Sequence, residues 1–191
     1  MSKNILVISA SLRNGSNSDM REICRLLHRE LQRRYEFMRG ALESGNKAEK
    51  ITLRGKSINF CKGCLACQKT GKCVIKDDMA EILPKMQQAD VICFASPVYF
   101  YDMCGQLKTF LDRTNPLFPA EYNFTDIYFL ITAADTEQSA SEGPLKGMQG
   151  WIDCFENAGL KGVVCGLGAE KPGDVKSMPA MNEAYMLGKQ A

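Results

Sequence analysis

Four cysteines crowd into thirteen residues of this chain, which has nine cysteines in 191 residues. They are Cys61, Cys64, Cys67 and Cys73, and the first three follow a C-x2-C-x2-C pattern. Bacterial ferredoxins use such a compact run to wrap thiolates around an iron–sulfur cluster, whereas structural zinc sites more often combine two separated pairs. The spacing therefore favours a [4Fe–4S] cluster. The alternative is a reduced, cluster-free loop whose cysteines pack together or form a labile disulfide.

A polar loop near the N-terminus could bind a phosphate group. It covers residues 9–18, between an apolar run and a helix-like stretch. Unpaired backbone N–H groups and the positive end of the helix dipole point into such a loop. Three serine hydroxyls and one arginine would complete a site for a phosphate monoester. These residues are Ser11, Ser16, Ser18 and Arg13. The spacing matches neither the GxGxxG fingerprint nor the P-loop, so a plain polar turn is the alternative.

A third candidate is the loop that begins at residue 96 and reads SPVYFY. It follows a strongly apolar run, and its aromatic side chains cannot all belong to the core. They could form a wall against a planar ring such as an isoalloxazine, with backbone N–H groups bound to the polar edge of the ring. A loop that simply packs onto its neighbours explains the same residues equally well. Cys104 follows this loop.

The elements that must position these loops follow from hydrophobic periodicity. Short apolar runs predict five strands, at residues 3–9, 50–54, 90–96, 126–133 and 160–167. Apolar steps of three and four predict helices at residues 19–38, 77–86, 105–113, 144–158 and 181–189. Pro84 is expected to kink or split the second helix. Residues 39–49 and 97–104 are expected to be loops.

Apolar strands that alternate with amphipathic helices are typical of a parallel sheet covered on both faces. We therefore expect one α/β domain over residues 1–191, with a cysteine-rich loop at about 58–76. Five strands permit the doubly wound order 2-1-3-4-5, whose ligand crevice lies where strands 1 and 3 diverge. The polar loop and the aromatic loop follow those two strands. The sequence thus predicts that both loops meet at one crevice.

Composition and charge exclude several classes of protein. The net charge of +2 gives no basic excess of the kind that nucleic-acid binders carry. No apolar run approaches the ~18 residues of a membrane span, and the N-terminus lacks the apolar core of a signal peptide. A single histidine, His28, is too few for a His-rich metal site. The odd, clustered cysteines favour a reducing compartment, so we expect a cytoplasmic protein without nucleic-acid or membrane partners.

Three segments resemble the NADPH-dependent FMN reductase family, and with the matching strands and helices the likeness covers nearly the whole chain. The segment ASLRNGSNS resembles that family's FMN phosphate loop. The segment SPVYFYDMCGQLKTFLDR is similar to its flavin-ring loop and the following helix. The segment CKGCLACQKTGKCVIKDDM resembles the cysteine motif of its iron–sulfur flavoprotein branch.

This resemblance implies a flavodoxin-like fold that binds FMN at the carboxyl edge of the sheet. The residues implied to hold the phosphate are Ser11, Arg13, Ser16, Asn17 and Ser18. Those implied to line the ring are Pro97, Val98, Tyr99 and Phe100, with Thr132, Ala133 and Asp135 closing the other side. Tyr101 and Asp102 are bulkier than the residues that often follow the aromatic pair, so access to the ring is expected to differ.

The function implied by the resemblance is that of an FMN-dependent oxidoreductase. NADH or NADPH would deliver hydride, and the electrons would pass to a small-molecule or protein acceptor, with a [4Fe–4S] cluster on Cys61, Cys64, Cys67 and Cys73 as a further carrier. The resemblance also implies a homodimer or homotetramer. The alternatives are a flavin or quinone reductase without a cluster, an electron carrier without its own substrate, and a binding protein with structural zinc. Flavodoxin-type carriers are typically strongly acidic, so the net charge of +2 favours the enzyme.

Overall fold

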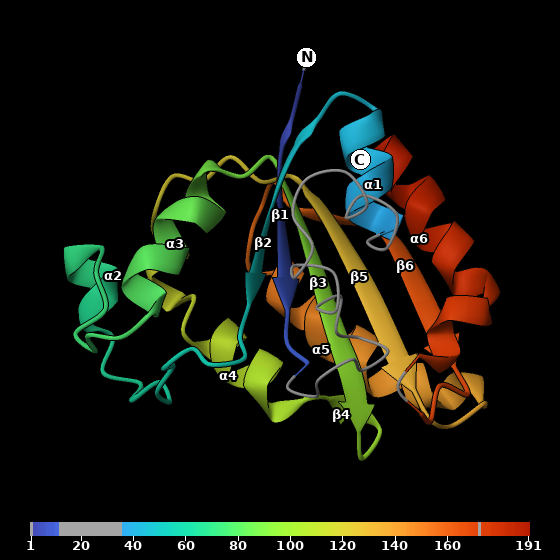
Figure 1. Ribbon diagram of the computed structural model, residues 1–191. Helices are drawn as coiled ribbons and strands as arrows, with labels where there is room; N and C mark the ends of the chain where they lie inside the picture. The colour runs from blue at the N-terminus through green and yellow to red at the C-terminus, as the bar shows by residue number, and fades with distance from the viewer. Residues whose placement is uncertain (1, 12–35, 172) are drawn as a thin grey trace.

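The structure is a computed structural model that describes residues 2–11, 36–171 and 173–191. At its centre is a six-stranded sheet in which five strands run parallel in the order β2-β1-β3-β5-β6 (Figure 1). The short strand β4 pairs antiparallel with β3. The predicted order 2-1-3-4-5 is confirmed, because β4 is a hairpin arm that only shifts the numbering of the later strands.

The elements have the following bounds. The strands are β1 (Asn4–Ser9), β2 (Lys47–Thr52), β3 (Val91–Tyr99), β4 (Asp102–Met103), β5 (Asp126–Ala133) and β6 (Gly159–Leu167). The α-helices are α1 (Glu36–Glu43), α2 (Ala66–Thr70), α3 (Met79–Gln88), α4 (Gly105–Asp112), α5 (Glu142–Ile152) and α6 (Pro179–Gln190). No helix in this described part of the chain is long and apolar enough to cross a membrane.

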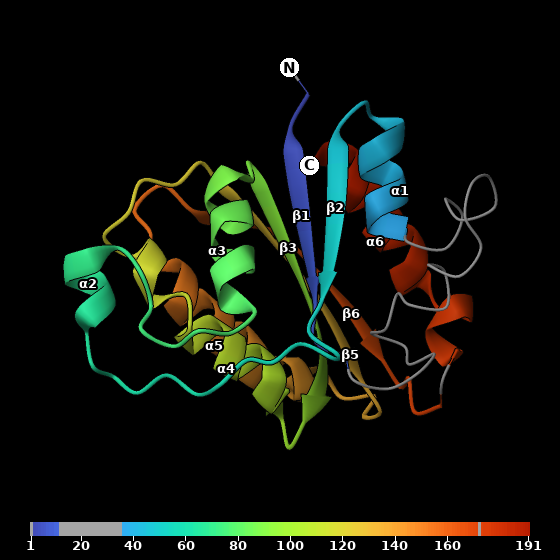
Figure 2. The ribbon, with the colours of Figure 1, turned by 60° about the vertical axis from the view of Figure 1, so that its left-hand side comes forward.

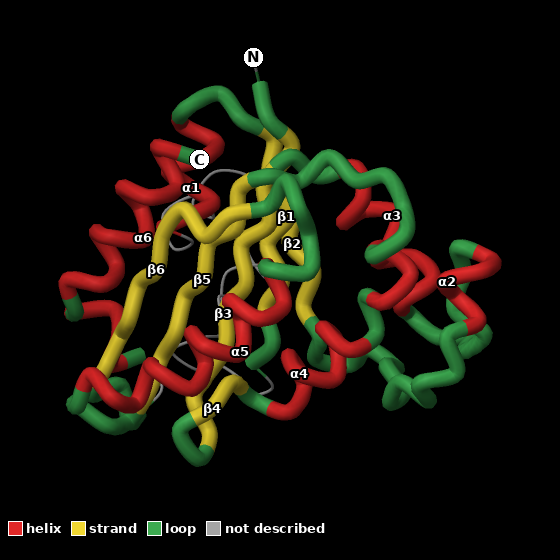
Figure 3. Tube along the Cα trace, turned by 180° about the vertical axis from the view of Figure 1, so that it is seen from behind, coloured by secondary structure: helices red, strands yellow, loops and turns green. Residues whose placement is uncertain are grey.

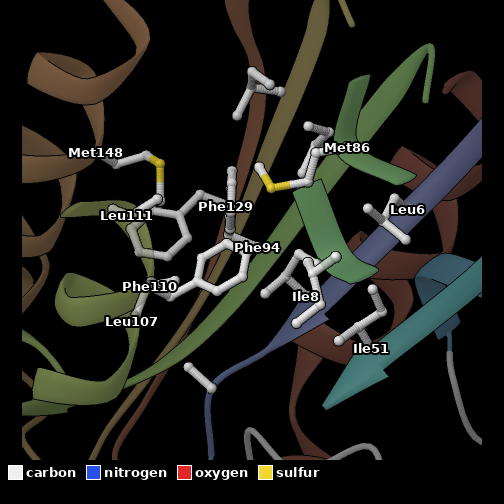
Figure 4. Packing of buried hydrophobic residues seen from close by; sticks show 14 of the residues in the cluster. Leu6, Ile8, Ile51, Met86, Phe94, Leu107, Phe110, Leu111, Phe129 and Met148 are labelled. Carbon is white, nitrogen blue, oxygen red and sulfur yellow. The ribbon is translucent and has the colours of Figure 1, made fainter. Parts of the chain in front are cut away.

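Side chains alternate along each strand, so the sheet buries one set of residues on each face. Leu6 and Ile8 of β1 join Phe94 of β3 in the cluster beneath α3, α4 and α5 (Figure 4). Val7 lies in the opposite cluster, which Phe37 of α1 and residues of α6 complete. Figures 1 and 3 show the resulting three layers, with α1 and α6 on one side of the sheet and α4 and α5 on the other.

Two glycines bring α1 and α6 into backbone contact. A Cβ on Gly40 would lie 2.2 Å from the carbonyl oxygen of Tyr185, and one on Gly188 would lie 1.9 Å from that of Phe37. This contact explains why the predicted loop at residues 39–49 is wrong: Gly40 serves helix packing rather than chain reversal, and α1 continues through it. The first half of β2 also falls in that range, where an alternation of exposed and half-buried residues marks an edge strand.

The predicted helix at residues 144–158 is too long. Helix α5 ends at Ile152, and the following residues form tight turns in which the Phe155 N–H donates to the Ile152 carbonyl at 2.8 Å. These turns let the ring of Phe155 pack against Trp151, with 4.7 Å between ring centroids. Aromatic packing thus ends a helix that periodicity alone would continue.

Helix α3 continues through Pro84, so the expected split is wrong, while the expected kink stays a prediction. The proline lacks an N–H and removes one helical hydrogen bond. The buried side chains of Met79, Ile82, Leu83 and Met86 hold both halves of α3 against the sheet and outweigh that loss.

Candidate functional site

The carboxyl end of β1 is polar but fully buried. Ser9 and Ser11 have no exposed surface, although both carry hydroxyl groups. The Ala10 N–H donates to the Ala95 carbonyl at 2.9 Å, so the chain beyond β1 stays beside β3. Among the residues predicted to bind phosphate, Ser11 therefore lies where the carboxyl ends of β1 and β3 adjoin. Arg13, Ser16, Asn17 and Ser18 lie outside the described residues.

The aromatic segment forms a hairpin rather than the predicted loop at residues 97–104. Val98 pairs with Met103 and Tyr99 with Asp102, which leaves a two-residue turn. Both turn residues, Phe100 and Tyr101, have positive φ, at 50° and 60°. Such turns favour Asn-Gly, because a bulky side chain in this region costs about 1–2 kcal/mol. Strain of this kind in a non-glycine residue clusters at ligand-binding sites.

The tip of this hairpin is exposed. The side chain of Phe100 is as open to solvent as in an extended chain, at 103%, and Tyr101 is 58% exposed. Phe100 thus stands in a strained turn without burying surface among the described residues. The predicted ring-binding residues Pro97 and Val98 lie at the half-buried base of the hairpin.

A side-chain hydrogen bond connects the hairpin to the loop after β5. The Tyr101 hydroxyl donates to Asp135 Oδ2 at 2.7 Å, and this bond raises the pKa of the tyrosine. A hydrogen bond from the Glu137 N–H, together with that from Tyr101, lowers the pKa of Asp135. At the base, Pro97 pairs with Thr132 of β5. The structure therefore brings the two predicted ring-binding segments together at one edge.

Cys104 anchors the other end of the hairpin. Its N–H donates to Ser96 Oγ at 3.1 Å, and its thiol lies 3.7 Å from the Ala10 carbonyl oxygen. The side chain is fully buried. It therefore ties β1, β3 and α4 together from within the core.

The four clustered cysteines line one small pocket on the far side of α3. Cys61 and Cys64 are exposed, Cys73 is half-buried and Cys67 is buried. Figures 1 and 2 show that the segment carrying α2 projects from the α3 side of the molecule. Among the described residues, no three His, Cys, Asp or Glu side chains converge to bind one metal ion. The sulfurs thus surround a space rather than meet at one point.

The backbone of this segment turns tightly, and one backbone donor contacts a sulfur. Gly63, Leu65 and Gly71 have positive φ, at 62°, 55° and 69°. The Gly63 N–H donates to Cys61 Sγ at 3.5 Å. Burial raises the pKa of the Cys67 thiol, and the other three sulfurs raise it further. Four sulfurs in one pocket would therefore ionise together only around a strongly cationic group, and this donor set fits an iron–sulfur cluster.

A buried ion pair between Arg113 and Asp77 lies next to Cys73, and the sequence did not predict it. Arg113 follows α4 and is 1% exposed, and its guanidinium contacts Asp77 and Cys73. No local pattern signals the pairing, because the two residues are 36 positions apart.

Comparison with known proteins relates the chain to flavoproteins. The model of the family described as NADPH-dependent FMN reductase matches residues 3–142. An iron–sulfur flavoprotein of Methanocaldococcus jannaschii is 46% identical over 82 residues, which are 43% of this chain and 42% of that protein. The chain thus spans about two fifths of the length of this curated relative.

Two further proteins match over nearly their full length. A Bacillus subtilis protein whose name describes an NAD(P)H-dependent FMN-containing oxidoreductase is 27% identical over 98% of this chain and 97% of its own. The structure of an NAD(P)H:quinone oxidoreductase from Methanothermobacter marburgensis superposes with a TM-score of 0.67 at 20% identity, covering 100% of this chain and 94% of that one. At that identity, the structural likeness shows the fold alone.

Proposed function

The chain belongs to the NADPH-dependent FMN reductase family, and on that premise we propose that it is an FMN-dependent oxidoreductase. It takes electrons from NADH or NADPH and passes them to a small-molecule or protein acceptor. One observation carries this proposal. The buried serines at the end of β1, the strained aromatic hairpin and the Asp135 loop meet at a single edge of a doubly wound sheet. That edge is where such sheets bind their ligands.

The residues at this edge fit FMN. Ser11, Arg13, Ser16, Asn17 and Ser18 would hold the phosphate. Pro97, Val98, Tyr99 and Phe100 would line one side of the ring, and Thr132, Ala133 and Asp135 the other. Bound FMN would supply hydride and single-electron chemistry that these side chains lack. The hydrogen bond from Tyr101 to Asp135 would hold the hairpin and the β5 loop at a fixed separation on either side of the ring.

We further propose that Cys61, Cys64, Cys67 and Cys73 hold a [4Fe–4S] cluster. Four thiols around one pocket and the likeness to an iron–sulfur flavoprotein support this assignment. A bound cluster would accept and release one electron at a time. The exposed Cys61 and Cys64 leave the pocket open to an electron-transfer partner at the surface.

The assembly and location of the protein belong to the same proposal. We infer a cytoplasmic homodimer or homotetramer, with no nucleic-acid partner. Light scattering after gel filtration gives the oligomeric state, and a monomer at micromolar concentration would contradict it.

The proposed reaction is tested by anaerobic stopped-flow mixing of the FMN-loaded protein with NADPH or NADH. Loss of flavin absorbance is expected with at least one of them, followed by reoxidation with quinone, nitroaromatic, free flavin or a protein acceptor. If dithionite bleaches the flavin and neither nicotinamide does, the protein is an electron carrier rather than a reductase.

The phosphate site is tested with Arg13→Ala combined with Ser16→Ala. This double variant is expected to bind FMN much more weakly and riboflavin as before, because only FMN carries the phosphate. Equal loss of affinity for both ligands would show that Arg13 and Ser16 do not bind the phosphate.

The cluster is tested by iron and sulfide assays on anaerobically purified protein. About four irons per chain are expected. Cys67→Ser should lose them and keep FMN. Cys154→Ser is the matched control, since Cys154 is an exposed cysteine outside the pocket. Iron-free wild-type protein with full FMN, even after attempted reconstitution, would indicate a simple flavin reductase.

A further inference from the structure

Arg113 is the largest fully buried side chain in the described part of the chain. A buried guanidinium cannot lose its proton, so burial is costly unless its donors are satisfied. Arg113 directly follows α4, which begins at the hairpin of the proposed flavin site. An eight-residue helix is ~12 Å long. One rigid helix therefore links the flavin edge to the cysteine pocket.

The guanidinium joins the two ends of the cysteine segment, defined here as residues 59–77. Its Nη1 donates to the Asn59 carbonyl at 2.7 Å and to Asp77 Oδ2 at 2.6 Å. Its Nη2 donates to Asp77 Oδ1 at 2.9 Å. The Asn59 N–H donates to the same carboxylate at 2.9 Å. Arg113 and Asp77 thus hold the two ends of the cysteine segment together, and we call this set of hydrogen bonds the clasp.

Arg113 makes one further contact, to a cysteine sulfur, that is not needed to hold the ends of the segment together. Arg113 Nη2 lies 3.5 Å from Cys73 Sγ and donates to it. Cys73 stands apart from the C-x2-C-x2-C run, so that run cannot fix its position. The two-pronged bond to Asp77 would hold the guanidinium in place without this additional contact. The bond to sulfur therefore brings a buried positive charge to the fourth ligand.

We propose that Arg113 is a positioning residue for the iron–sulfur cluster, which it serves by holding Cys73 and by donating a charged hydrogen bond to its sulfur. This inference rests on the proposed cluster. Hydrogen bonds to ligand sulfur and nearby positive charge stabilise the more negative, reduced cluster and so raise its reduction potential. The clasp slows loss of iron, because Cys73 cannot swing away while residues 59 and 77 are held together.

The test compares Arg113→Gln, which removes the charge, with Arg113→Lys, which keeps the charge but not the planar fork. Lys108→Gln is the matched control, because Lys108 is an exposed cation on the same helix. Each variant is assayed for its content of iron, sulfide and FMN and for the rate at which it loses iron to a chelator. Its electron paramagnetic resonance spectrum and the midpoint potential of its cluster are also measured. Arg113→Gln is expected to lower the potential, change the spectrum and speed iron loss, with FMN content unchanged. Lys108→Gln should match the wild type.

Asp77→Asn separates the two roles of Arg113. It loosens the clasp while the guanidinium remains beside Cys73, so iron loss should accelerate while the potential stays closer to that of the wild type than in Arg113→Gln. Arg113→Lys should likewise lose iron faster, with a smaller fall in potential than Arg113→Gln.

Several results would refute this role. An Arg113→Gln protein with wild-type potential, spectrum and iron retention would do so. If Arg113→Gln does not fold, Arg113→Lys with wild-type iron retention would do so instead. Loss of FMN and of folding in both variants would assign Arg113 to the general fold. Iron-free wild-type protein would refute the proposed cluster itself, which is a different outcome.

Discussion

At the scale of single residues, the hairpin tip departs most from what local sequence preferences favour. Phe100 and Tyr101 both adopt positive φ, where glycine or asparagine would be unstrained. Tyr101 gains a hydrogen bond to Asp135 there, but Phe100 is fully exposed and buries no surface among the described residues. The fold therefore holds Phe100 in a costly conformation, as expected of a residue that contacts a ligand.

Phe100→Asn is accordingly expected to stabilise FMN-free protein by about 1 kcal/mol and to raise its Tm by about 2–4 °C, because asparagine tolerates positive φ. The same change should weaken FMN binding through loss of the proposed ring contact. Phe118→Asn is the control, since Phe118 is also exposed but has φ of −57°. Thermal unfolding and FMN fluorescence titration measure both effects. An unchanged Tm for Phe100→Asn would show that the turn is unstrained.

Asp77 makes a pH-dependent contribution to stability. Burial alone would raise the pKa of its carboxyl, but hydrogen bonds from Arg113 and Asn59 outweigh burial and lower the pKa to about 2. A carboxyl whose pKa is lower in the folded state than the ordinary ~3.9 stabilises the protein above pH ~4. This contribution, about 2–3 kcal/mol, is lost as the pH falls to about 2.

The destabilisation caused by Asp77→Asn should therefore shrink between pH 4 and pH 2, because the wild-type carboxyl becomes neutral over that range. Urea unfolding of iron-free wild-type and variant protein at pH 6, 4, 3 and 2 measures the difference. A difference that is constant over this range would contradict the low pKa of Asp77.

At the scale of elements, the first turn of α5 positions the hairpin. A Cβ on Gly143 would lie 2.1 Å from the Tyr101 carbonyl oxygen, so the helix and the hairpin tip touch through their backbones. Asp135, from the loop after β5, holds the Tyr101 side chain at the same place. The tip is thus fixed by two elements that follow it in the chain.

Gly143→Ala should displace the tip and weaken FMN binding on the order of tenfold, or about 1.4 kcal/mol. Overpacking should also lower stability by about 1–3 kcal/mol. In Gly150→Ala on the same helix, the new methyl group has no atom within 4 Å apart from the adjacent residues and the backbone of its own helix. It is expected to stabilise the protein by up to about 1 kcal/mol and to leave FMN binding unchanged. If Gly143→Ala binds FMN with wild-type affinity, the hairpin tip is not part of the FMN-binding site.

At the scale of the whole molecule, the two proposed sites lie in different places. The hairpin stands at the carboxyl edge of the sheet, while the segment with α2 projects beyond α3 (Figures 1 and 2). Removal of iron with a chelator is therefore expected to leave FMN bound, with flavin absorbance unchanged after gel filtration. Release of FMN in step with iron would show that the two sites depend on one another.

The sequence alone determined the α/β class and the run of clustered cysteines, whereas it only permitted the strand order that the structure has. These features depend on local regularities: runs such as residues 126–133 are apolar over the length of a strand, helical faces repeat every three or four residues, and the three-cysteine run spans only seven positions. The aromatic residues after β3 were likewise recognised as candidates for ring binding from their types and their place after a buried strand.

Only the tertiary structure decided how those residues are held. Arg113 meets Asn59 across 54 positions, Tyr101 meets Asp135 across 34, and Gly188 meets Phe37 on another helix. Hydrophobic periodicity names the face of each element that is buried, but it does not name the partner on the other side. Such partners are chosen when the whole chain packs. The buried Arg113, the strained Phe100 and the continuation of α1 through Gly40 were therefore beyond prediction from local pattern.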